Sequence, residues 1–164
     1  MRQCTLCFIV RDNPTSQVLL GMKKRGFGKG KWNGLGGKVA PNESVEAAAC
    51  REFYEEAAVQ LSPDQLTKAA ELTFLFTNPP AGETWDQVVH VFVAREWEGL
   101  PRESDEMRPE WFDTHNLPFD SMWKDDPHWL PLVLEGKKIK ARFTFDADNE
   151  SIVQKELTIV NEVP

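Results

Sequence analysis

The segment from Gly37 to Val59 places three glutamates at a fixed spacing behind a glycine-rich stretch. Glu52, Glu55 and Glu56 stand at positions i, i+3 and i+4. On a helix these positions project from one face, within an arc of about 100°. Crowded carboxylates raise one another's pKa unless a cation lies among them. The segment therefore predicts a helix that carries a site for a hard divalent ion with oxygen ligands, such as Mg²⁺.

The pattern around this helix predicts an α+β domain in which helices flank a mixed β-sheet, with α-β-α layers. The glutamate helix is expected over Ser44–Ala57, and a second helix over His128–Lys137. Strands are expected over Thr5–Val10, Gln17–Lys23, Leu72–Phe76, Val88–Ala94, Glu110–Asp113, Ala141–Asp146 and Ser151–Ile159. A chain of 164 residues predicts one domain over 1–164.

Composition and charge exclude several classes of protein. The net charge of −7 argues against a protein that coats polymeric nucleic acid. No apolar run approaches the ~20 residues that a membrane-spanning helix needs. The three cysteines make a disulfide framework unlikely, so a reducing cytoplasm is the default location, with the mitochondrion or nucleus as further options. We expect a monomer that acts on a small molecule.

Positive charge gathers directly ahead of the glutamate helix. No acidic residue occurs between Asn13 and Asn42, whereas this stretch contains six cations: Lys23, Lys24, Arg25, Lys29, Lys31 and Lys38. One interpretation is a solvated loop that balances the glutamates. The other, favoured by the adjacent glutamates, is an entrance that binds phosphate groups.

The spacing of the segment resembles the signature of the Nudix hydrolase family. Gly37 is followed after five residues by Glu43 and after seven more by Arg51-Glu52-Phe-Tyr-Glu-Glu56. The resemblance implies a mixed sheet between helices and hydrolysis of a nucleoside diphosphate that is linked to another group. The chain departs from the family at Ala58, where a glycine is usual. Because a left-handed conformation is common after a helix, alanine there is expected to cost about 1 kcal/mol unless the turn is remodelled.

The acidic residues have distinct expected roles. Glu52, Glu55 and Glu56 are expected to hold Mg²⁺, for which Mn²⁺ is an alternative, and the carbonyl of Gly37 is a further candidate ligand. The resemblance favours Glu106 as another ligand or as the base that activates water, with Asp105 and Glu103 as rivals. Glu56, Glu52 and Glu106 are thus the catalytic candidates. An ion pair between Arg51 and Glu43 is expected to be buried and to join the loop to the helix.

Other segments narrow the resemblance to the animal MutT-homologue branch of the family. They are Gly21–Val39, Glu103–Pro109 and Met122–Asp126. Enzymes of this branch convert 8-oxo-dGTP, 2-hydroxy-dATP and related oxidised purine nucleoside triphosphates to the monophosphate and pyrophosphate. Two alternatives remain open: a Nudix pyrophosphatase for another nucleoside diphosphate derivative, and a nucleotide-binding regulator without turnover.

Several residues are candidates for binding such a nucleotide. Trp123 offers a flat face on which a purine can stack. Asp125 and Asp126, if desolvated together, keep one proton near neutrality, so that one carboxyl donates and the other accepts. The planar amide of Asn33 suits a base edge. The resemblance adds Thr5, Lys23, Phe27, Leu35, Gly36, Gly37, Lys38, Phe74, Phe76 and Lys124. The Asn78–Gln87 loop is longer than is usual in the family.

Overall fold

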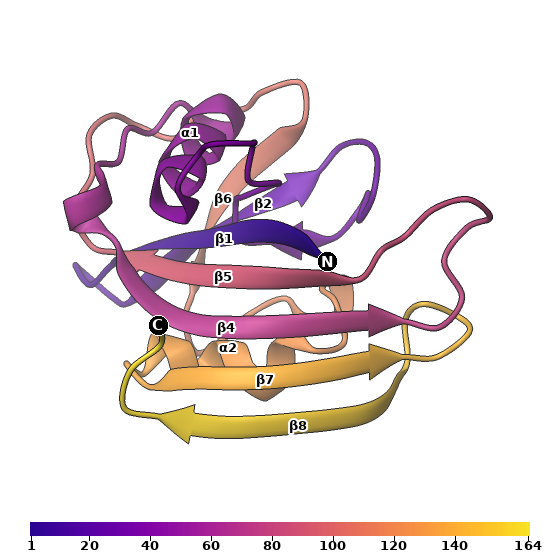
Figure 1. Ribbon diagram of the computed structural model, residues 1–164. Coiled ribbons are helices and arrows are strands. Elements are labelled where there is room, and N and C mark those ends of the chain that lie inside the picture. Colours follow the sequence, from indigo (N-terminus) through magenta and orange to yellow (C-terminus); the bar gives the residue numbers. More distant parts are fainter.

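The computed structural model describes residues 1–164, and its centre is one mixed β-sheet (Figure 1). The strands are β1 (Arg2–Arg11), β2 (Gln17–Lys23), β3 (Trp32–Asn33), β4 (Thr67–Phe76), β5 (Gln87–Ala94), β6 (Met107–Asp113), β7 (Lys138–Phe145) and β8 (Ile152–Val160). Their order is β3-β2-β1-β5-β4-β7-β8, and β6 pairs with β2. The pairs β1–β5 and β4–β7 are parallel, whereas the other neighbours are antiparallel.

Two helices cover opposite faces of this sheet, which confirms the α+β class and the predicted layers. Along β1, Cys7 and Ile9 pack in a cluster with residues of α1 (Val45–Ala57). Phe8 and Val10 point to the other face and pack in a cluster with residues of α2 (Asp126–Leu134). This alternation follows from the two-residue period of a strand that is buried on both sides.

The sequence sets both ends of α1. The Ser44 side chain accepts a hydrogen bond from the N–H of Ala47, which caps the first turn. The helix ends at Ala57, and Ala58 adopts the left-handed conformation with φ 60° and ψ 22°. The turn that normally uses glycine is therefore retained rather than remodelled.

The expected elements are all present, but several boundaries differ. β1 begins at Arg2 and β4 at Thr67, earlier than expected, because these first residues already pair with Gln87 and Val93 of β5. The short β3 has too few residues to show an alternating pattern, and it was not predicted. α2 begins at Asp126 and ends at Leu134 rather than running from His128 to Lys137. No helix is long and apolar enough to span a membrane.

Candidate active site

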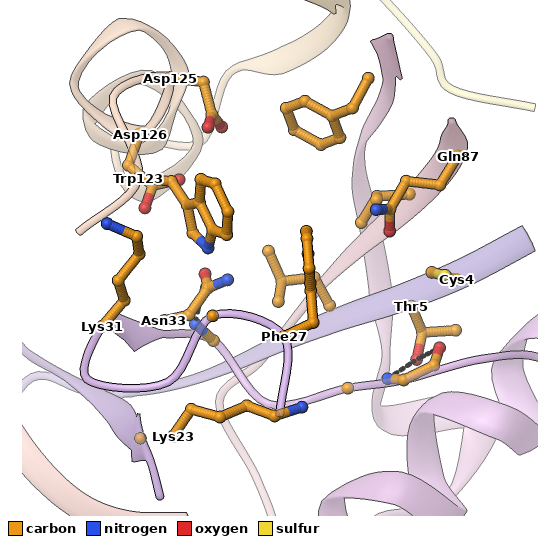
Figure 2. A pocket seen from close by; sticks show the side chains of 18 of the residues that line it. Cys4, Thr5, Lys23, Phe27, Lys31, Asn33, Gln87, Trp123, Asp125 and Asp126 are labelled. Atoms are coloured by element: carbon orange, nitrogen blue, oxygen red, sulfur yellow. Dashed lines mark hydrogen bonds between the residues drawn. The ribbon is translucent and has the colours of Figure 1, made fainter. Parts of the chain in front are cut away.

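A cavity of about 250 Å³ opens beside the ends of β1, β4 and β5 (Figure 2). The start of β1 forms its floor, and the glycine-rich segment before α1 and the segment ahead of α2 form two of its sides. The cavity is lined by these predicted nucleotide-binding residues: Thr5, Lys23, Phe27, Asn33, Gly36, Gly37, Lys38, Phe74, Phe76, Trp123, Asp125 and Asp126. Glu56 reaches the same cavity from α1. Residues from five parts of the chain are thus brought together.

Aromatic rings form one wall of the cavity. Phe27 stacks on Trp123 with ring centroids 5.2 Å apart, and the amine of Lys31 lies 5.0 Å from the Trp123 ring centroid. Phe27 is 39% exposed. It lies between Gly26 and Gly28, both of which have positive φ. Trp123 therefore belongs to an aromatic cluster at a partly open mouth, where its ring contacts Phe27 and Lys31.

Asp125 and Asp126 are buried rather than solvated, at the N-terminal end of α2. Oδ2 of Asp125 accepts a hydrogen bond from Nε1 of Trp129 at 2.8 Å, whereas Oδ2 of Asp126 has no partner. Burial raises the pKa of Asp125 to about 6. Burial, and then the neighbouring Asp125 carboxylate, raise the pKa of Asp126 well above its usual range. Both carboxyls therefore keep their protons to higher pH than solvated aspartates do.

Two carboxylates of α1 lie against the glycine segment. Glu56 is only 3% exposed, and its Oε1 accepts a hydrogen bond from the N–H of Gly36 at 2.8 Å. Burial and the nearby Glu52 raise the pKa of Glu56 to about 8. Burial also raises the pKa of Glu52. The charge of Glu106 adds to the rise at both positions, so these three carboxylates share one region of negative potential.

The glycines at 36 and 37 are required by close packing. A Cβ on Gly36 would lie 1.9 Å from the carbonyl oxygen of Thr5, and one on Gly37 would lie 2.5 Å from the Glu52 carboxyl carbon. The Gly37 carbonyl accepts a hydrogen bond from the Thr5 N–H at 2.8 Å. These contacts hold the backbone between β1 and α1.

Arg51 joins this segment to α1. It donates two hydrogen bonds to Glu43, at 2.7 and 2.9 Å, and one to the carbonyl of Lys38 at 3.1 Å. Arg51 also donates to Glu52 at 3.0 Å and to Glu55 at 3.4 Å. The pKa of Glu43 falls to about 2 because Arg51 binds its charged form. The predicted Arg51–Glu43 pair is present, but the Arg51 side chain is 35% exposed, so the pair is not buried as expected.

The predicted metal ligands do not converge into one group. No three His, Cys, Asp or Glu side chains among residues 1–164 are arranged to hold an ion. Glu52 and Glu55 face Arg51, Glu56 faces the Gly36 N–H, and Glu106 lies 3.4 Å from Arg25. Arg51, the Gly36 N–H and Arg25 thus hold these carboxylates in three different directions.

The donor chemistry nevertheless fits a hard divalent cation. The groups are all oxygen ligands, which Mg²⁺ prefers over nitrogen or sulfur. Glu52 raises the pKa of Glu56, and Glu55 and Glu106 raise the pKa of Glu52; a bound cation would relieve this repulsion. The Gly37 carbonyl accepts from the N–H of Thr5 at 2.8 Å and from its hydroxyl at 3.5 Å.

Two predicted nucleotide-binding residues are placed elsewhere, so these predictions are corrected. Leu35 is fully buried in the hydrophobic cluster beneath α1. Its backbone pairs with that of Cys7, whose side chain lies in the same cluster. Lys124 does not line the cavity, since the chain turns there into α2 and presents Trp123, Asp125 and Asp126 instead.

Sequence reasoning also missed lining residues. Gln87 and Phe145 reach the cavity from β5 and the end of β7. Phe145 was expected in a strand, but the sequence gives no sign that β7 pairs with β4 and so borders the cavity. Gln87 was placed at the end of a loop, although it follows the β5 alternation with Val89.

Comparison with known proteins matches this geometry to a family. A model of the NUDIX domain matches residues 1–133. The chain belongs to the NUDIX family. NUDIX hydrolases generally use a divalent metal ion.

Curated NUDIX relatives cover nearly the whole chain. The chain is 46% identical over 159 residues to the oxidized purine nucleoside triphosphate hydrolase of Danio rerio, covering 97% of this chain and 96% of that protein. It is 46% identical over 145 residues to the protein of the same name from Mus musculus, covering 88% of each. The MutT protein of Bacillus halodurans shares the fold, with a TM-score of 0.76 at 21% identity over 96% of this chain and 97% of that one.

Proposed function

We propose that this NUDIX protein hydrolyses oxidised purine nucleoside triphosphates to the monophosphate and pyrophosphate, with Mg²⁺ as its cofactor. The observation that carries the proposal is one cavity with two chemical ends. Asp126, buried and with one unpartnered oxygen, lines it from the start of α2, and the carboxylate of Glu56 lines it from α1. A nucleotide has the same two ends, a base with hydrogen-bonding edges and a phosphate chain. The two curated relatives, named as oxidized purine nucleoside triphosphate hydrolases, support this assignment.

At the phosphate end, Glu52, Glu55, Glu56 and Glu106, with the Gly37 carbonyl, would hold the ion, and Mn²⁺ would serve in place of Mg²⁺. The ion supplies positive charge that neutralises phosphate oxygens and polarises the attacking water. Lys23 and Lys38, which line the cavity, add positive charge toward the phosphate chain. Glu56 is the proposed acceptor of the water proton, because it alone of the four carboxylates lines the cavity.

At the base end, Trp123 is the proposed stacking surface for the purine. Asp125 and Asp126 read the base edge by exchanging proton states, since a protonated carboxyl donates to a purine carbonyl and an ionised one accepts from N–H. Asn33, with a donor and an acceptor on one amide, completes this edge. Thr5, Phe27, Phe74 and Phe76 complete the walls around the base.

We further propose that residues 1–164 form one domain, that the protein acts as a monomer in the cytoplasm, and that its substrate is a small nucleotide rather than a polymer. One continuous sheet from β3 to β8 supports the single domain. The net charge of −7 disfavours binding of long nucleic acids.

The test at the phosphate end is the exchange Glu56→Gln, which keeps an acceptor for the Gly36 N–H and removes the negative charge. We expect kcat for 8-oxo-dGTP with Mg²⁺ to fall about 10²- to 10⁴-fold, without any loss of thermal stability relative to the wild type. Glu156→Gln, the same exchange on exposed β8, is the control and should keep wild-type kcat. Unchanged kcat in Glu56→Gln would remove Glu56 from the mechanism.

The test at the base end compares Asp125→Asn and Asp126→Asn. Each variant replaces one carboxyl by an amide, which cannot gain or lose a proton. Each should therefore change the ratio of kcat/KM between guanine-like and adenine-like oxidised nucleotides. Identical ratios in both variants and the wild type would show that the pair does not read the base.

A further inference from the structure

Gln87 is a polar residue of the cavity that has no role in the scheme above. Gln87 is the first residue of β5 and lies opposite Phe74 of β4 in the antiparallel pair, so both side chains share one face. Val89 follows Gln87 along this face of β5, and Arg2 of β1 is the neighbour of Gln87 on the other side. Figure 2 shows the Gln87 amide directed into the cavity, across from Trp123, Asp125 and Asp126.

The backbone fixes which way this amide faces. Nε2 of Gln87 donates a hydrogen bond to the carbonyl oxygen of Trp85 at 3.2 Å. A carbonyl can only accept, so this contact requires the NH₂ group on that side. Oε1 and the second N–H of Nε2 make no other hydrogen bond in the structure, and they form an acceptor and a donor side by side.

The long loop before β5 anchors the Trp85 carbonyl. The Trp85 ring packs edge-on against Phe27, with centroids 4.6 Å apart, and against Phe76, with centroids 5.4 Å apart. Oδ1 of Asp86 accepts a hydrogen bond from the N–H of Phe76 at 2.8 Å. Turning the Gln87 amide over would place Oε1 against the Trp85 carbonyl and break the existing bond.

An acceptor beside a donor matches one edge of an oxidised purine. In an 8-oxopurine, N7 carries a hydrogen and C8 carries a carbonyl, so this edge offers a donor beside an acceptor. In an undamaged purine, N7 is an acceptor and C8 carries only hydrogen. A purine whose six-membered ring meets Asp125 and Asp126 turns this imidazole edge to the opposite side of the cavity, where Gln87 lies.

We propose that Gln87 is a specificity-determining residue that recognises the oxidation itself. Its Oε1 accepts from N7–H while its free N–H donates to O8, and an undamaged purine would instead set two acceptors, N7 and Oε1, against each other. This inference rests on the proposed function, because it assumes that a purine nucleotide occupies the cavity. The inference also assigns a role to the long loop before β5, which holds the Gln87 amide in the orientation that distinguishes an 8-oxopurine from an undamaged purine.

The experiment measures binding of monophosphates by isothermal titration calorimetry, which does not depend on turnover. The ligands are 8-oxo-dGMP, dGMP and 8-bromo-dGMP, and the last is bulky at C8 but lacks the N7 hydrogen. The variant is Gln87→Met, and Gln154→Met on exposed β8 is the matched control. Melting temperatures of all proteins check that each variant is folded.

The wild type and Gln154→Met should bind 8-oxo-dGMP more tightly than dGMP or 8-bromo-dGMP. In Gln87→Met, the affinity for 8-oxo-dGMP alone should fall, by about tenfold to a hundredfold. The inference is overturned if Gln87→Met keeps the wild-type preference, if 8-bromo-dGMP binds as tightly as 8-oxo-dGMP, or if the wild type shows no preference.

A parallel assay of 8-oxo-dGTP hydrolysis separates this inference from the proposed function. If the binding pattern appears and the wild type releases no pyrophosphate, the recognition by Gln87 stands and the proposed hydrolysis fails. If the wild type hydrolyses 8-oxo-dGTP with a preference that Gln87→Met retains, the proposed function stands and the role of Gln87 fails.

Discussion

Exchange of Ala58 for glycine should stabilise this protein. Ala58 follows α1 with φ 60°, and its N–H donates to the Tyr54 carbonyl at 2.9 Å. A left-handed conformation costs a residue with a Cβ about 1–2 kcal/mol. Glycine avoids this cost but gains about 0.4–1 kcal/mol of freedom in the unfolded chain. Ala58→Gly should therefore raise the free energy of unfolding by about 0.5–1 kcal/mol.

The assay is thermal unfolding of Ala58→Gly beside Ala81→Gly. A gain of this size should raise Tm by about 1–4 °C in a chain of this length. Ala81 is exposed in the loop after β4 and lacks positive φ, so glycine there should lower Tm or leave it unchanged. Activity should not change in either variant, since neither side chain lines the cavity. A Tm for Ala58→Gly at or below that of the wild type would refute the argument.

Three further changes test the site. Trp123→Ala should raise KM for the oxidised nucleotide about 5- to 150-fold, because a base–aromatic stack is worth about 1–3 kcal/mol, and steady-state kinetics will measure it. The pKa of Glu56 is raised from 4.5 to about 8, so the folded state holds this proton more tightly than the unfolded state. The stabilisation of the folded state by this bound proton is complete below pH 4.5, and it is lost progressively as the pH rises through about 8. The free energy of unfolding, measured with denaturant and a chelator, should be equal in Glu56→Gln and the wild type near pH 4.5. At pH 9 it should be higher in Glu56→Gln by about 3–5 kcal/mol, since one pKa unit corresponds to about 1.36 kcal/mol. Equal free energies of unfolding at pH 9 would contradict the raised pKa. Gly36→Ala places a Cβ 1.9 Å from the Thr5 carbonyl and should lower the free energy of unfolding by about 3 kcal/mol or more, a loss that circular dichroism will detect.

The sequence predicted the features that depend on local spacing. The face of α1 that carries Glu52 and Glu56 follows from helical periodicity, and the start of the helix was predicted to within one residue. The link from Arg51 to Glu43 follows from the family resemblance and is present in the structure. These features depend on only a few residues that are near in the sequence, so they can be predicted without knowledge of the fold.

Features that depend on strand pairing were not predictable. Gln87 enters the cavity because β5 lies between β1 and β4, and no short-range pattern encodes that order. Leu35 was expected in the cavity from the family resemblance, but it pairs with Cys7 and packs in the cluster beneath α1. The partners of the carboxylates were likewise unpredictable, since Arg25 meets Glu106 only through tertiary packing.

The most direct test of the central claim is steady-state hydrolysis of 8-oxo-dGTP beside dGTP with Mg²⁺, with pyrophosphate and phosphate measured separately. The account predicts release of pyrophosphate and a higher kcat/KM for the oxidised nucleotide. Pyrophosphate release without any preference would support the proposed roles of the phosphate-binding residues and contradict the proposed recognition of the base. No release from either nucleotide would contradict the proposed hydrolysis and favour another diphosphate substrate or a regulator without turnover.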